Sequence, residues 1–144
     1  MTDARHSLAA AALIGVALAG CGGSTSQTIA PAARVEHVPG SPADRIVLSA
    51  AGAQRIGIQT APARGVPHES TVTIPFSAVV YDPSGATYAF TSPAPLTFTE
   101  VPIAIDHIDG DTAYLRSGPP AGTEVVTVGA EELYGVQTGV QAQT

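Results

Sequence analysis

The stretch Ile74–Phe90 reads Ile-Pro-Phe-Ser-Ala-Val-Val-Tyr-Asp-Pro-Ser-Gly-Ala-Thr-Tyr-Ala-Phe and decides the fold. Two β-prone runs, Ala78–Tyr81 and Ala86–Phe90, flank the four residues Asp82–Gly85. Those four have the chemistry of a tight turn, because proline presets φ, aspartate bonds to its own backbone and glycine tolerates a positive φ. The stretch therefore predicts a β-hairpin, an element that is also common in any small β domain.

Upstream of the hairpin, the sequence predicts three strands and a short helix. Ser49 can act as the N-cap of a helix over Ala50–Arg55, and Gly57 can end it. The expected strands cover Arg45–Ser49, Ile58–Ala61 and His68–Ile74, with Pro75 at an end or an edge.

Downstream, Leu96–Ile105 alternates between apolar and polar residues, with a phase change near Glu100 that predicts a β-bulge there. Ser92–Pro95 is expected to be a loop. Two more strands are expected at Thr112–Arg116 and Glu124–Val128, followed by one helical turn at Ala130–Tyr134 and a short strand within Val136–Thr144.

About seven short strands with one or two short helices predict a mainly β fold, a small β-roll or sandwich. We expect it to be preceded by a signal peptide and a flexible linker. The expected organisation is a signal peptide at 1–20, a flexible tether at 21–44, one β domain at 45–139 and a tail at 140–144.

The N-terminal region carries the clearest local signal. Arg5 and His6 precede thirteen uncharged residues, Leu8–Gly20, a length that suits a signal peptide and is too short for a mature transmembrane helix. Leu18-Ala19-Gly20-Cys21 resembles the bacterial lipobox, and Cys21 is the only cysteine. We therefore expect lipidation of Cys21 and an extracytoplasmic protein anchored to the membrane; the alternative is an ordinary secretory signal with a chance cysteine.

Charge and motifs argue against several classes of function. The net charge is −6, there is no lysine and the six arginines are scattered, which argues against nucleic-acid binding. Asp106, Asp109 and Asp111 are too closely spaced for a calcium loop, and the histidines are dispersed, so no metal site or other cofactor is expected. Ser77, His107 and Asp106 could form a triad on paper, but no nucleophile motif accompanies them, so no enzyme is expected.

Five segments, in order, resemble one known family. They are Ile46–Pro62 with its Arg-Ile-Gly-Ile-x-Thr-Ala-Pro ending, Ile74-Pro75-x-Ser77-Ala78-Val79 followed by Tyr88-x-Phe90, Phe98-x-x-Val101-x-Ile103, Asp109-Gly110-Asp111 through Ser117-Gly118, and Ala121–Ala130. Together they are similar to the periplasmic adaptor subunits, or membrane fusion proteins, of RND-type and HlyD-type efflux systems. The resemblance covers about Arg45 to Gly139.

The resemblance implies the membrane-proximal domain of such an adaptor, which docks on an RND-type inner-membrane transporter. The family's lipoyl half-motifs, helical hairpin and β-barrel have no counterpart here, because only about ten residues separate Pro62 from Val72. Candidate partner-binding residues are the hairpin aromatics Phe76, Tyr81, Tyr88 and Phe90, with core positions as the alternative for some of them. A homo-oligomer is possible.

A second function of a different class stays open on the sequence. It is a free-standing cell-envelope lipoprotein that binds a small ligand or scaffolds the envelope. A deep apolar pocket in the roll would favour that function, whereas a neighbouring transporter gene would favour the adaptor.

Overall fold

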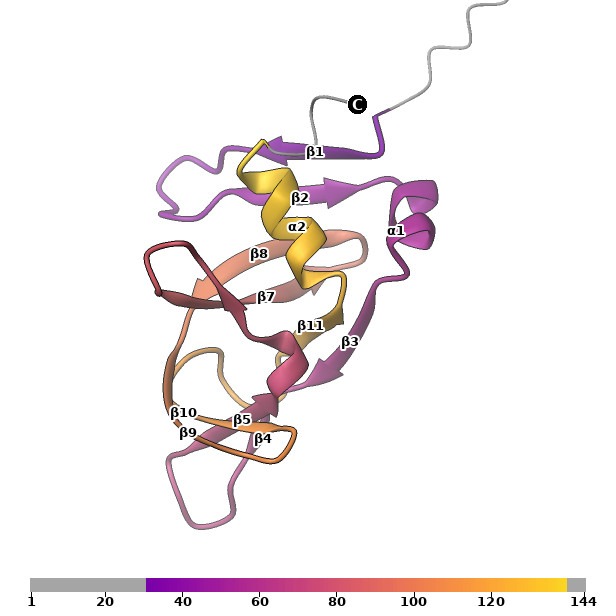
Figure 1. Cartoon of the computed structure of the whole chain (residues 1–144). Coiled ribbons are helices and arrows are strands. Elements are labelled where there is room, and N and C mark those ends of the chain that lie inside the picture. Colours follow the sequence, from indigo (N-terminus) through magenta and orange to yellow (C-terminus); the bar gives the residue numbers. More distant parts are fainter. Residues whose placement is uncertain (1–30, 140–144) are drawn as a thin grey trace, which may run out of the picture.

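The structure, a computed structural model, describes residues 31–139 (Figure 1). The predicted signal peptide, Cys21 and the tail 140–144 lie outside the described residues. Strands make up 47% of the described chain in two antiparallel sheets, and helices make up 17%. The prediction of a mainly β fold with one or two short helices is confirmed.

The larger sheet has seven strands in the order β1-β2-β8-β7-β11-β3, and β6 also pairs with β7. The bounds are β1 Ala33–Glu36, β2 Arg45–Leu48, β3 Gln59–Pro62, β6 Val80–Tyr81, β7 Thr87–Ala94, β8 Thr97–Pro102 and β11 Glu124–Val128. Figure 1 shows β1 at the upper edge of this sheet, with helix α2 (Ala130–Gln137) across its face.

The smaller sheet has four strands in the order β4-β5-β10-β9 and lies at the lower end of the view in Figure 1. The bounds are β4 Arg64–Gly65, β5 Val72–Pro75, β9 Ala104–Asp109 and β10 Thr112–Ser117. A 3₁₀ turn, η1 (Phe76–Ala78), joins β5 to β6 and so links the two sheets along the chain.

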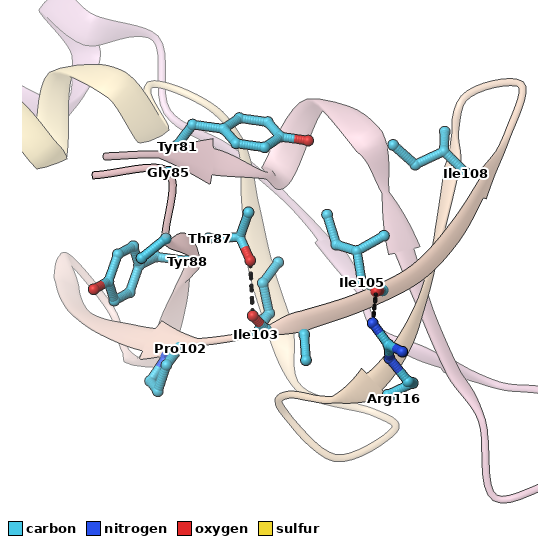
Figure 2. Close-up of a pocket in the computed structure, with 11 residues that line it drawn as sticks. Tyr81, Gly85, Thr87, Tyr88, Pro102, Ile103, Ile105, Ile108 and Arg116 are labelled. Atoms are coloured by element: carbon cyan, nitrogen blue, oxygen red, sulfur yellow. Dashed lines mark hydrogen bonds between the residues drawn. The ribbon is translucent and has the colours of Figure 1, made fainter. Parts of the chain in front are cut away.

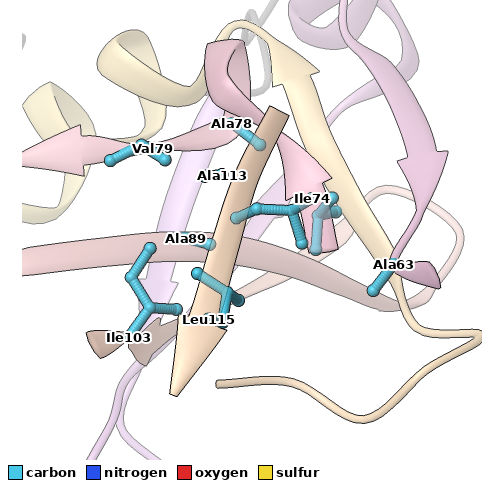
Figure 3. Close-up of a cluster of buried hydrophobic side chains, with 9 residues drawn as sticks. Ala63, Ile74, Ala78, Val79, Ala89, Ile103, Ala113 and Leu115 are labelled. Carbon is cyan, nitrogen blue, oxygen red and sulfur yellow. The ribbon is translucent and has the colours of Figure 1, made fainter. Parts of the chain in front are cut away.

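The middle of the larger sheet is buried on both faces. Consecutive residues within β7 and β11, and at the start of β6, face two different cores, so the apolar residues here come in adjacent pairs rather than at alternate positions. The first core lies between the sheets and includes Val79, Ala89 and Val125 (Figure 3). The second core lies under α2 and holds their chain neighbours Val80, Phe90 and Val126.

The phase change predicted near Glu100 has a different cause from a bulge at that residue. The ten-residue run is two strands, β8 in the larger sheet and β9 in the smaller one, and the chain changes sheet at the buried Ile103. The irregular pairing along β7 and β8 falls instead between Thr91 and Ala94. The prediction of a bulge at Glu100 is wrong because a change of sheet also shifts the phase of the apolar residues.

Several local predictions are confirmed. Helix α1 (Ala50–Ile56) starts at Ser49, whose hydroxyl accepts a hydrogen bond from the Gly52 N–H at 3.0 Å. It ends at Gly57 with φ of 74°. The hairpin of β6 and β7 forms around Asp82–Gly85, and β11 has the predicted bounds.

Two other local predictions are wrong, and a third is wrong for the residues that the structure describes. The expected tether at 21–44 contains β1, which pairs with β2 because Ala33 packs against the second core. The expected loop at Ser92–Pro95 is strand as far as Ala94. The strand expected within Val136–Thr144 is absent from 136–139, because α2 continues through Gln137 with Leu133 packed against the larger sheet; 140–144 lie outside the described residues.

We predict that Gly52→Ala releases β1 from the sheet. A Cβ at Gly52 would overlap the carbonyl oxygen of Ala32, which accepts a hydrogen bond from the Ser49 N–H at 2.9 Å. Alanine gains about 1 kcal/mol of helix propensity over glycine, but overpacking against backbone costs about 1–3 kcal/mol.

Faster amide exchange at Arg34 and Glu36 and a lower melting temperature are therefore expected. Gly65→Ala is the control, because a Cβ there meets only Ala121 at an ordinary 3.5 Å. Unchanged exchange in β1 of the Gly52 variant would show that α1 does not hold this strand.

Candidate docking surface

A groove open to solvent lies where the β6–β7 hairpin meets the crossover from β8 to β9 (Figure 2). Its volume is about 530 Å³. The hairpin contributes Tyr81, Gly85, Ala86, Thr87 and Tyr88, the crossover and β9 contribute Pro102, Ile103, Ala104, Ile105 and Ile108, and β10 contributes Arg116. The groove therefore joins residues of both sheets.

The turn of the hairpin is held by the Asp82 side chain. Its Oδ1 accepts hydrogen bonds from the Ser84 hydroxyl at 2.6 Å, from the Ser84 N–H at 2.8 Å and from the Ala86 N–H at 2.9 Å. The Ser84 hydroxyl is the largest of the effects that lower the pKa of Asp82 below its ordinary value. The carboxylate is thus charged at neutral pH, and its stabilisation of the turn is lost as the pH falls through that lowered pKa.

The other wall is fixed to the hairpin by Thr87. Its hydroxyl donates to the Ile103 carbonyl at 2.8 Å, and its own carbonyl accepts from the Ile103 N–H at 3.0 Å. These two bonds hold the chain at the residue where it changes sheet (Figure 2). The groove is therefore a preformed feature of the fold, and its walls are joined by hydrogen bonds.

Arg116 supplies the positive charge in the groove. Its guanidinium donates to the Ile105 carbonyl at 2.8 Å and lies 3.9 Å from the Asp106 carboxylate. Asp106 also contacts His107, whose ring stacks on Tyr114 with centroids 4.3 Å apart. The rim is thus polar on the β9–β10 side.

The groove is lined in part by apolar side chains that are exposed to solvent. Tyr81 is 50% exposed and Ile108 is 44% exposed. Tyr88 and Ile105 are half-buried beside them. An aromatic and an aliphatic side chain held at a concave surface with a polar rim are typical of a protein–protein interface.

The structure divides the four predicted partner-binding aromatics into three groups. Tyr81 and Tyr88 line the groove. Phe76 is 39% exposed in η1, but it does not line the groove. Phe90 is fully buried in the second core, so the prediction that it lies on a docking surface is wrong; it faces α2 because it follows Ala89, which faces the other sheet.

Sequence reasoning missed Ile105, Ile108 and Arg116. The available signal was Ile108, a lone isoleucine among the polar residues Asp106, His107, Asp109 and Asp111. Single exposed apolar residues are common on protein surfaces, so the sequence alone does not distinguish Ile108 as a contact position.

The described residues 31–139 contain no group of three or more His, Cys, Asp or Glu side chains that could hold a metal ion. Ser77 makes no side-chain hydrogen bond to the Asp106–His107 pair within the same residues. No helix in this part of the chain is long and apolar enough to cross a membrane.

A second hollow of about 530 Å³ lies between β1, α1 and α2. Its apolar lining includes Leu48, Ile56 and Val136, and Arg34, Arg55 and Glu132 stand around it. It shares no lining residue with the groove.

Comparison of the chain with protein-family models, with curated proteins and with solved structures finds no match. The resemblance to efflux adaptors consequently stays a prediction from the five segments.

We predict that the same substitution costs much more stability at one phenylalanine than at another. Phe90→Ala removes a side chain with 0% exposure and should lower the free energy of unfolding by about 3–5 kcal/mol. Phe76→Ala, at 39% exposure, should cost less than about 1 kcal/mol. Denaturant unfolding measures both, and equal losses would contradict the assignment of Phe90 to the core and Phe76 to the surface.

Proposed function

We propose that this chain is a lipid-anchored, extracytoplasmic accessory protein of an RND-type efflux transporter. It acts by protein–protein docking in transmembrane export and carries out no catalysis. Cys21, outside the described residues, would carry the lipid that holds it at the membrane. The observation that carries the proposal is the preformed groove with the exposed side chains of Tyr81 and Ile108.

The topology supports this function. In the adaptor family the membrane-proximal domain combines segments from both ends of a long chain. Here the segment that resembles the first of these forms β3, and it pairs antiparallel with β11, which lies in the segment that resembles the last. The two segments are adjacent in one sheet, so the domain does not need the family's intervening domains in order to close.

The chemistry of the groove suits a transporter surface. Tyr81 can bury a large ring while its hydroxyl stays in the polar rim, which is how tyrosine anchors interfaces. The net charge of −6 would steer the protein toward a basic partner surface and fix its orientation more than its affinity. A docking role of this kind requires no cofactor.

The second hollow favours a second candidate, a free-standing envelope lipoprotein that binds a small apolar ligand. Its lining of Leu48, Ile56 and Val136 has the composition of a ligand site. The groove carries the larger exposed side chains, and we therefore place docking first.

The test is recovery of partners from detergent-solubilised membranes with the full chain as bait, followed by mass spectrometry. We expect an RND-type transporter in stoichiometric amount with the wild-type chain. The double variant Tyr81→Ser/Ile108→Ser should recover at least about thirtyfold less, which corresponds to the loss of one interface anchor of about 2 kcal/mol.

Val128→Ser is the matched control, because Val128 is 41% exposed and lies outside the groove. Melting temperatures of all the variants are compared to exclude unfolding. Recovery of the lipoprotein alone, or undiminished transporter with the double variant, would contradict the proposal.

A further inference from the structure

Strand β1 forms an open edge of the larger sheet. Within residues 31–139 it pairs only with β2, and Figure 1 shows it as the outermost strand. The Ser49 N–H donates to the Ala32 carbonyl. Because hydrogen-bonded pairs recur at every second residue of an antiparallel strand, the backbone groups of Ala32, Arg34 and Glu36 face β2. The N–H and C=O groups of Ala33 and Val35 therefore point outward, away from the sheet.

The other sheet edges in the described chain are blunted. β3 ends in Pro62, and β4 and β6 have only two residues each. β9 has a register irregularity at Asp106 and carries the charges of Asp106 and Asp109. Proline, short length, bulges and repeated like charge all discourage strand addition, whereas β1 has neither a proline nor a register irregularity.

We propose that β1 is a self-association site, at which a second copy of this chain adds its own β1 antiparallel about a two-fold axis through Val35. The backbone N–H and C=O groups of the two Val35 residues then form hydrogen bonds with each other. In this register, Arg34 of each copy stands opposite Glu36 of the other. The contact is isologous and closes at a dimer.

The order of charges in β1 selects this register. Only residues with outward backbone groups can form hydrogen-bonded pairs, so the register can shift only by two residues at a time along one strand. The neighbouring register, with Ala33 opposite Val35, places Arg34 directly opposite Arg34 of the second copy, and like charges in that position are destabilising. The proposed register instead joins two opposite-charge pairs.

The side chains are free to make these contacts. Arg34 and Glu36 form an exposed ion pair within the strand, with Nε and Oε1 2.7 Å apart and side-chain exposures of 63% and 39%. In the dimer, the two Arg34 and two Glu36 side chains lie on one face of the joined sheet, and each is next to side chains of opposite charge. On the opposite face, Val35 is 42% exposed beside the hollow between β1, α1 and α2, and its counterpart would cover it.

Four-residue strands bury a small area, so we expect a weak, reversible dimer. The inference is independent of transporter docking, because β1 contributes no residue to the groove.

Charge reversal in the full chain tests the register, with sedimentation velocity as the measurement. Arg34→Glu alone and Glu36→Arg alone should each weaken self-association by about tenfold or more, because each places like charges opposite one another. A mixture of the two single variants should form a heterodimer, and the double variant R34E/E36R should dimerise like the wild type.

A wild-type chain that stays monomeric at the highest concentration reached would overturn the proposal. So would single variants that associate as well as the wild type, or a mixture that does not restore association.

Disulfide trapping locates the axis. A hydrogen-bonded antiparallel pair has Cα atoms about 5.5 Å apart, a separation that a disulfide bridges. Mild oxidation should therefore link Val35→Cys chains, whereas the control Val128→Cys, which carries the same Cys21, should give only background. Equal linkage of both variants would contradict pairing at β1.

Discussion

The two-sided burial of β7 and β11 is the constraint on which the rest of the structure depends. Chain neighbours such as Ala89 and Phe90 face opposite cores. The same few strands therefore pack against the smaller sheet on one face and against α2 on the other. At about 25 cal/mol per Å² of buried apolar surface, a side chain as large as Phe90 stabilises the fold substantially.

The groove follows from that arrangement. One face of the larger sheet is covered by α2 and the other by the smaller sheet, and the chain passes between the two sheets at several points, one of which is Ile103. The hydrogen bonds of Thr87 fix this passage to the hairpin and leave Tyr81 and Ile108 exposed on either side. The candidate site is thus a consequence of the sheet-to-sheet connection.

The sequence predicted the elements that depend on local chemistry. The Ser49 cap, the Gly57 stop and the Asp82–Gly85 turn each rest on a few adjacent residues, and all three form as expected. What depends on distant contacts escaped prediction: β1 is stabilised by pairing with β2, and the division of Leu96–Ile105 between two sheets leaves the same phase change as a bulge. In the site, Tyr81 was foreseen, but Ile108 lies on β9 in the smaller sheet, and its place near the hairpin depends on the change of sheet at Ile103.

The central claim is that the groove contacts a transporter, and a photo-crosslink tests it most directly. A photoreactive phenylalanine analogue would replace Tyr81 in the full chain, with the same analogue at Val128 as the comparison position, and intact cells would be irradiated. The account predicts covalent capture of an RND-type transporter from position 81 and not from position 128. Capture of no transporter from position 81, or equal capture from both positions, would contradict it.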